Sequence, residues 1–96
     1  MKESDFQKQL IEELKNRFPN CVVLKNDPTY KQGIPDLTVL HKDKWVCLEV
    51  KKANNANHQP NQDYWVEKLD EMSYAAFIYP DNKEEVLNEM EQLFLS

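Results

Sequence analysis

The fold is decided by the stretch G-I-P-D-L-T-V-L-H-K-D-K-W-V-C-L-E-V-K-K, residues 33–52. Two runs rich in apolar and β-branched side chains, 34–41 and 44–51, flank a short polar turn. Such a pair of runs predicts a β-hairpin. The two strands nevertheless carry three charged residues, which are Asp36, Glu49 and Lys51.

The second strand of this hairpin divides its side chains between two faces, because successive residues of a strand alternate. Its valines and its leucine point to one face, whereas Glu49 and Lys51 both point to the other. A turn at 42–43 brings the start of the first strand beside the end of the second. We therefore expect Asp36 to lie close to Glu49 and Lys51.

Two carboxylates at hairpin distance repel each other unless a cation lies between them. Magnesium suits such a pair, since it prefers oxygen ligands, often one or two carboxylates completed by water and phosphate oxygens. Lys51 is then placed to hold or activate a water molecule, or to stabilise charge that develops on a phosphate. Gly33 and Pro35 shape the entry to Asp36. The alternative is a solvated strand face on which the three charges form salt bridges.

The first 25 residues predict a helix and a strand. Apolar residues recur at helical spacing over residues 3–18, and Ser4 with Gln7 fits a capping box at the start of this helix. A short β-rich run follows at 21–25, and a polar loop leads from it to Gly33.

The C-terminal part predicts a helix over residues 61–72, a strand over 74–79 and a last helix. The strand is apolar without alternation, so we expect a central strand that is covered on both faces. The last helix has two candidate capping pairs, Asp81 with Glu84 and Asn82 with Glu85. The order helix, three strands, helix, strand, helix predicts an α/β fold with a mixed four-stranded sheet flanked by helices.

The composition, 41% hydrophobic and 30% charged over 96 residues, predicts a single globular domain, 1–96. No apolar run approaches the roughly 20 residues that span a bilayer, and the N-terminus lacks the apolar core of a signal peptide, so a cytoplasmic location is expected. Cys21 and Cys47 lie in apolar runs without metal-ligand spacing, which predicts buried, reduced thiols, with a structural metal site or a disulfide as the alternative. Neither His41 nor His58 has a spaced Cys or His partner, and no zinc site is expected.

The net charge of −5 is unevenly distributed along the chain. Residues 25–58 carry a net charge of +2, and residues 59–96 carry −7. The basic middle segment is compatible with phosphate binding, and the acidic C-terminal segment is typical of solvated helices.

The sequence Gly33-Ile-Pro-Asp-Leu, followed after a short gap by Leu48-Glu-Val-Lys, resembles the PD-(D/E)XK nuclease signature. Within that superfamily, the chain most resembles the small stand-alone VRR-NUC domains, which are often phage-encoded, and the resemblance covers nearly its whole length. Such domains begin with a Glu-Ser pair before an amphipathic helix, as Glu3-Ser4 does here, and have a first strand that ends in Lys or Arg, as Lys25 does. The resemblance implies a restriction-endonuclease-like core with the element order read above.

The resemblance also implies roles for the residues of the hairpin. Asp36 and Glu49 would bind Mg²⁺, for which Mn²⁺ would substitute, and the Val50 carbonyl would be a further ligand. Lys51 would be the catalytic lysine. No organic cofactor is implied.

Two further residues, Gln62 and Glu3, are implied from the helices. Gln62 matches a glutamine in the first turn of the helix after the Glu-x-Lys strand, and it lies on the stripe that should face the sheet, where a polar side chain needs a partner. The alternative is a hydrogen bond at the start of its own helix. Glu3 would be an accessory acid that reaches the metal directly or through water, with Glu12 and Glu13 as competitors on the same helix.

The expected activity is that of a magnesium-dependent DNA endonuclease, in which water attacks a phosphodiester in line. The resemblance implies that this attack leaves a 5′-phosphate. The resemblance to the stand-alone members of the family further implies a homodimer that acts on branched DNA, including four-way (Holliday) junctions. The alternatives are a non-catalytic DNA-binding module or a phage accessory interaction module on the same fold, and no membrane partner is expected. Four residues are candidate DNA contacts, namely Lys25, Tyr30, Lys31 and Lys52.

Overall fold

The computed structural model describes the whole chain, Met1–Ser96, as an α/β fold. Its elements in chain order are α1 (Glu3–Arg17), β1 (Val22–Lys25), β2 (Leu37–His41), β3 (Lys44–Val50), α2 (Gln62–Met72), β4 (Ala75–Ile78), the 3₁₀ turn η1 (Pro80–Asn82) and α3 (Lys83–Leu95). The order predicted from the sequence is confirmed, with η1 as an addition before the last helix. None of the helices has the length and apolarity that crossing a membrane requires.

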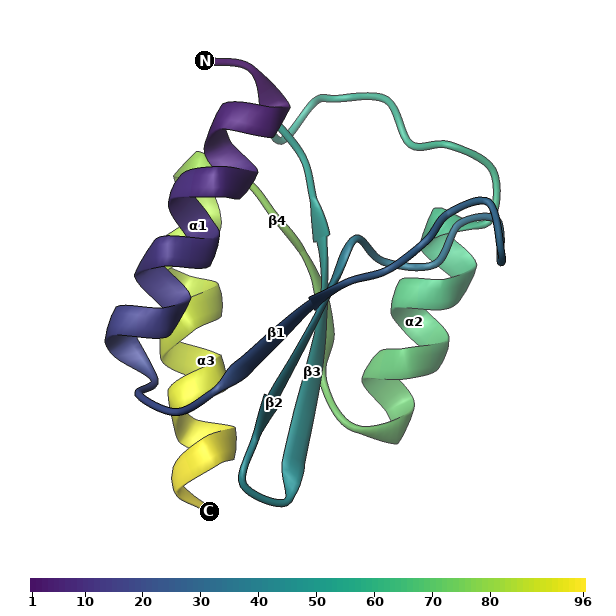
Figure 1. Cartoon of the computed structure of the whole chain (residues 1–96). Coiled ribbons are helices and arrows are strands. Elements are labelled where there is room, and N and C mark those ends of the chain that lie inside the picture. The colour runs from purple at the N-terminus through teal and green to yellow at the C-terminus, as the bar shows by residue number, and fades with distance from the viewer.

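The four strands form one mixed sheet in the order β1-β2-β3-β4. The first three strands are antiparallel, whereas β4 runs parallel to β3. Helices α1 and α3 lie on one face of the sheet, and α2 lies on the other (Figure 1). The predicted hairpin is confirmed, with Leu37 opposite Leu48, so that Asp36 comes level with Glu49.

The main core fills the space between the sheet and the two helices α1 and α3. It contains Val46, Leu48 and Val50 of β3, as the alternation predicts. The opposite face holds a much smaller apolar cluster of Cys47, Val66 and Ala75 beneath α2. Burial of the main core therefore sets which face of β3 turns toward α2, and with it the direction of Glu49.

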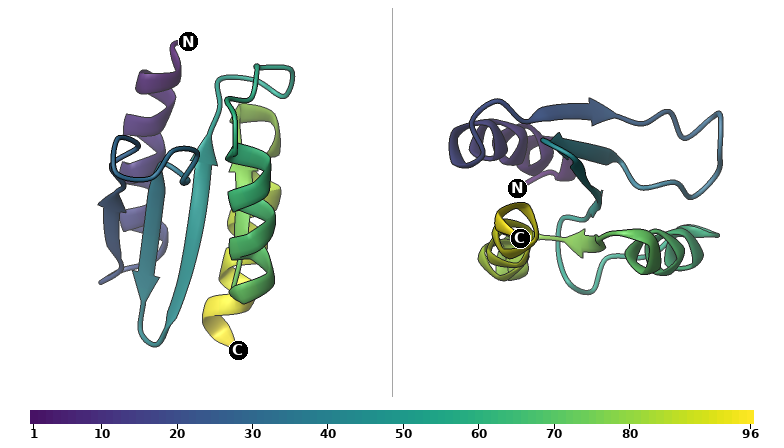
Figure 2. Two further views of the ribbon diagram at one scale, coloured as in Figure 1. Left: turned by 90° about the vertical axis from the view of Figure 1, so that its right-hand side faces the viewer. Right: turned by 90° about the horizontal axis from the view of Figure 1, so that it is seen from below.

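All three α-helices begin at the same end of the sheet, the end at which β3 and β4 finish (Figures 1 and 2). A helix N-terminus carries unpaired amides and a partial positive charge. In open α/β sheets, ligands bind beyond the carboxyl ends of the parallel strands. This end of the molecule is therefore the one suited to hold anions.

Strand β4 lies at the edge of the sheet, so the prediction of a central strand is wrong. Its cover on both faces is confirmed, because Ala75 packs toward α2 and Ile78 packs into the main core, and Figure 2 shows β4 between α2 and α3. An apolar run without alternation indicates that both faces of a strand are covered. An edge strand that lies between two helix layers is covered in the same way.

The predicted start of β2 at residue 34 is also wrong, because the strand begins at Leu37. Pro35 has no amide hydrogen to pair, and the Val50 amide donates to the carboxylate of Asp36 at 2.8 Å rather than to a main-chain carbonyl. The main-chain hydrogen bonds between β2 and β3 therefore end at this point, where the side chain of Asp36 accepts from the Val50 amide instead.

None of the three predicted capping pairs caps its helix. Helix α1 begins at Glu3, after Lys2 at the cap position, and no side chain caps it, so Ser4 lies within the helix. At α3, the Asn82 side chain accepts from the Tyr79 amide at 2.8 Å and donates to the Phe77 carbonyl at 3.0 Å. Asn82 thus stabilises η1 and does not cap α3, and no side chain does.

The two cysteines are free thiols. Cys47 is buried under α2, as expected, whereas Cys21 is only half-buried before β1.

Candidate active site

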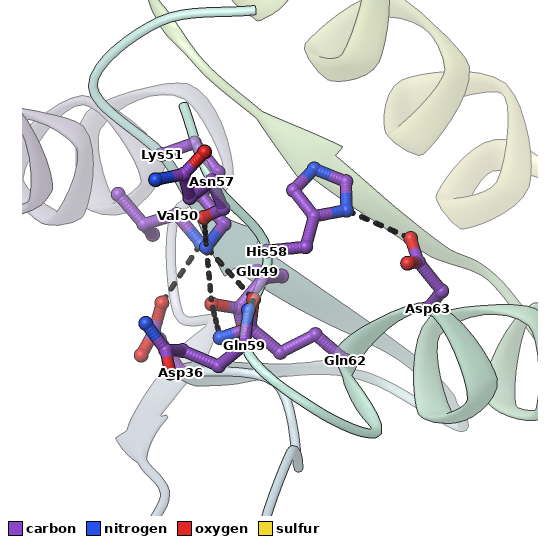
Figure 3. A network of polar contacts seen from close by, with 9 residues as sticks. All are labelled: Asp36, Glu49, Val50, Lys51, Asn57, His58, Gln59, Gln62 and Asp63. Carbon is purple, nitrogen blue, oxygen red and sulfur yellow. Dashed lines mark hydrogen bonds and ion pairs between the residues drawn. The ribbon is translucent and has the colours of Figure 1, made fainter. Parts of the chain in front are cut away.

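Three of the predicted residues, Asp36, Glu49 and Lys51, meet at the end of β3 (Figure 3). Glu49 is 3% exposed and Lys51 is 5% exposed, and no other charged residue of the chain is buried. Charged side chains are seldom this buried, because removing them from water is costly unless each is paired. The expected alternative, a solvated strand face, is therefore wrong for these two residues.

Gln62 of α2 bridges the two buried charges. Its Oε1 accepts from Lys51 Nζ at 2.7 Å, and its Nε2 donates to Glu49 Oε2 at 2.9 Å. The direct separation of Lys51 Nζ and Glu49 Oε2 is longer, 4.0 Å. The sequence-based expectation that Gln62 needs a partner is confirmed. The alternative expectation also holds, because the Gln59 amide donates to the same Oε1 at 2.9 Å.

Lys51 has a second fixed partner in the connection that follows β3. Its Nζ donates to the main-chain carbonyl of Asn57 at 2.9 Å. A lysine ammonium has three hydrogens to donate, so Asn57 and Gln62 engage two of them. The orientation of the ammonium is set by these two bonds.

Asp36 completes the cluster from the start of β2. It is half-buried, and its Oδ2 accepts from the Val50 amide at 2.8 Å. This bond fixes the carboxylate against the end of β3, where the Val50 carbonyl also lies.

Burial and crowding of negative charge act on Glu49. Loss of solvation raises the pKa of this carboxyl to about 8, with the Asp36 carboxylate as the next cause and the Glu3 charge as a smaller one, while Lys51 opposes the shift. A carboxylate that is hidden from water beside a second carboxylate is stabilised by a cation.

The side chains present fit a divalent cation of the magnesium kind. No three His, Cys, Asp or Glu side chains form a metal-binding group. Asp36, directly before β2, and Glu49 and the Val50 carbonyl of β3 offer oxygen ligands. Mg²⁺ is commonly held by one or two carboxylates with waters and phosphate oxygens in its other positions.

Glu3 is the first residue of α1 and is exposed, and its negative charge contributes to the raised pKa of Glu49. Its competitor Glu13 is engaged elsewhere, since its carboxylate accepts from Lys83 Nζ at 2.7 Å. Glu12 is exposed on the same helix. Of these acids, only Glu3 contributes to the raised pKa of Glu49.

The predicted DNA contacts are spread around the candidate site. Lys25 ends β1 beside the start of β2, and Lys52 follows Lys51 as an exposed residue. Tyr30 is 86% exposed in the loop between β1 and β2. Lys31 of the same loop places its Nζ 5.0 Å from the centre of the Trp65 ring, a cation–π contact with α2.

Two residues that support the site were not expected from the sequence. Asn26 donates through its Nδ2 to the Pro35 carbonyl and the Thr38 hydroxyl, both at 2.9 Å, and so holds the segment that presents Asp36. A polar residue directly after a strand was the available signal. Asn57 acts through its carbonyl, which any residue would supply, so no side-chain pattern could have revealed it.

The sequence matches none of the protein-family models and none of the curated proteins with which it was compared.

Proposed function

We propose that this chain is a metal-dependent DNA endonuclease with a PD-(D/E)XK core of the VRR-NUC kind. The observation that carries the proposal is the buried pair of Glu49 and Lys51, bridged by Gln62 and joined by Asp36. A cluster of this kind costs folding free energy, because two charges leave water and two carboxylates face each other. Groups held in such an unfavourable state are characteristic of catalytic sites.

The mechanism follows from what each side chain has free. A Mg²⁺ ion held by Asp36, Glu49 and the Val50 carbonyl would supply positive charge to a phosphate and lower the pKa of water. Lys51 keeps one hydrogen to donate after its bonds to Asn57 and Gln62. Lys51 would donate this hydrogen to the oxygen of the attacking water or to a phosphate oxygen on which charge develops. In-line attack of water on phosphorus would break the P–O3′ bond and leave a 5′-phosphate and a 3′-hydroxyl.

The proposed substrate is branched DNA, including four-way junctions, and the proposed assembly is a homodimer. The longest extent of one chain is 32 Å, about one turn of duplex DNA. One chain carries one candidate site, so it would cut one strand at a time. Two copies related by a two-fold axis would present two sites at a fixed spacing, as a symmetric junction requires.

The test is a cleavage panel of four-way junctions, forks and linear duplexes with Mg²⁺ or Mn²⁺. We expect cutting by the wild type and none by Asp36→Asn, because the asparagine can still accept from the Val50 amide while it removes a metal-binding carboxylate. Lys51→Ala should also be inactive, with circular dichroism to verify its fold. Asp43→Asn, an exposed position in the hairpin turn, is the matched control and should cut normally.

Persistent cutting by Asp36→Asn would contradict the assignment of the site. A wild-type protein that binds these DNAs and leaves all of them uncut would contradict the enzyme and favour a DNA-binding module. Light scattering of the purified chain should give twice its mass of 11.4 kDa; a monomer would contradict the dimer.

A further inference from the structure

A cavity of about 340 Å³ lies beside the candidate active site, and Lys51 is the one residue that belongs to both. This volume falls at the lower end of the ~300–1,000 Å³ that is typical of small-ligand sites. Neither Asp36 nor Glu49 contributes to its wall. The lining residues are Lys51, Ala53, Asn54, His58, Phe77, Tyr79 and Asn82.

The wall of this cavity has a charge opposite to that of the protein. The chain has 17 acidic residues and a net charge of −5, yet no carboxylate lines the cavity. Lys51 and His58 do line it, together with the hydroxyl-bearing Tyr79 and with Asn82, which directly precedes α3. Helix α3 adds the positive end of its dipole to this side. The surroundings thus favour an anion.

His58 is held in one orientation by two contacts. Its Nδ1 lies 2.8 Å from Asp63 Oδ1 (Figure 3). Its ring stacks on Phe77, with centroids 4.2 Å apart and planes inclined by 15°. Only Nε2 is then left for another partner, in a residue that lines the cavity. A side chain ordered in advance loses little entropy when it binds a ligand.

We propose that this cavity is a subsite for a phosphodiester group of the nucleic-acid strand, with Lys51 and the imidazolium form of His58 as its donors. In this form Nδ1 donates to Asp63 and Nε2 donates to the phosphate. The proposal rests on the proposed function, because Lys51 joins the cavity to the site of cleavage. A strand that passes over Lys51 would place one phosphate at Asp36 and Glu49 and a neighbouring phosphate against His58. His58 is then a substrate-binding residue that sets the path of the strand.

The first test uses the two histidines of the chain. His41 ends β2 at the hairpin turn, where its ring lies 5.0 Å from that of Phe94, far from the cavity. A short single-stranded DNA, added in EDTA, should shift the imidazole NMR signals of His58 until they saturate and leave those of His41 unchanged. Equal shifts of both histidines, or no shift of His58, would overturn the proposal.

Inorganic phosphate is the second arm of this test, and it distinguishes the strand from a free anion. A His58 shift that needs more inorganic phosphate than DNA phosphate supports a strand-binding subsite. A His58 shift with inorganic phosphate and none with DNA would overturn it.

The second test measures the affinity for the same DNA by fluorescence anisotropy, again in EDTA. His58→Ala should raise Kd about tenfold, as expected for the loss of one hydrogen bond to a charged group. His58→Gln should recover part of the affinity, because it restores a donor. The control is Asn55→Ala, an exposed position in the same connection, and it should bind as the wild type does.

These measurements need no cleavage, so the two proposals fail separately. An unchanged Kd in His58→Ala beside normal cutting by the wild type would overturn the subsite and leave the nuclease. Binding that depends on His58 in a protein that never cuts would support the subsite and contradict the nuclease. No DNA binding by the wild type would overturn the subsite.

Discussion

The environment of Glu49 disfavours its charged form, and this makes the stability of the metal-free protein dependent on pH. Its pKa in the folded protein is raised to about 8 from an ordinary 4.5. The folded state therefore holds a proton that the unfolded chain has released. The contribution to stability is complete below pH 4.5 and is lost as the pH rises toward 8.

The free energy of unfolding in EDTA should thus fall between pH 5 and pH 8, as measured by urea denaturation. Glu49→Gln should flatten the curve, because glutamine does not titrate. Asp27 and Tyr74 do not contribute to the slope in this pH range. The pKa of Asp27 is lowered by its bonds to Thr29, and burial raises the pKa of Tyr74. The same slope in wild type and Glu49→Gln would contradict this role of Glu49.

Gln62 allows a second prediction at the scale of one residue. Gln62→Leu keeps a side chain of similar size but leaves Lys51 and Glu49 without their shared partner. A buried polar group that loses its hydrogen bond costs about 1–3 kcal/mol. We expect a loss of this size in the free energy of unfolding, together with weaker cleavage. Gln92→Leu, at an exposed position in α3, should change neither quantity, and equal effects in both variants would contradict the bridging role.

At the scale of elements, the hairpin could be predicted almost completely from the sequence. Alternation along β3 and a turn at Lys42 and Asp43 require Asp36 to meet Glu49, because the main core fixes the face of the strand. The connection from β3 to α2 could not be predicted. Its contacts with Lys51 and Gln62 use the carbonyl of Asn57 and the amide of Gln59, and main-chain groups leave no mark in a sequence.

Gly33 links the loop before β2 to the start of α2. Its φ is +87°, and a Cβ at this position would lie 2.6 Å from the Cβ of Asn61 and 2.7 Å from its carbonyl carbon. Because Asn61 directly precedes Gln62, Gly33→Ala should displace the first turn of α2. We expect a loss of at least about 1 kcal/mol in stability and reduced cleavage.

The matched control for this prediction is Lys42→Gly. Lys42 also has a positive φ, +57°, but it lies in the hairpin turn at the other end of the sheet. Glycine accepts this backbone conformation without strain, so the free energy of unfolding should change by less than about 1 kcal/mol. Urea denaturation of both variants checks the pair, and a Gly33→Ala protein as stable as the wild type would contradict the close approach to Asn61.

On the scale of the whole molecule, the arrangement of lysines matters more than the net charge. Lys25 and Lys52 lie at the end of the sheet that carries the candidate site, and Lys31 lies beside α2. Lys42 lies in the hairpin turn at the opposite end, and Lys44 begins β3 directly after it. All five lysines belong to the basic segment 25–58 of the sequence. In the fold they form two groups, because β3 runs from the hairpin turn at one end of the sheet to the candidate site at the other.

This separation predicts how DNA affinity responds to salt. Each lysine that neutralises a phosphate adds roughly 0.9 to the negative slope of log K against log salt concentration for duplex DNA. Lys25→Ala and Lys52→Ala should each weaken binding and reduce the slope by about one. Lys42→Ala removes the same charge at the far end and should leave the slope unchanged. Equal losses in all three variants would mean that DNA responds only to total charge, and would contradict a DNA path across the end of β3.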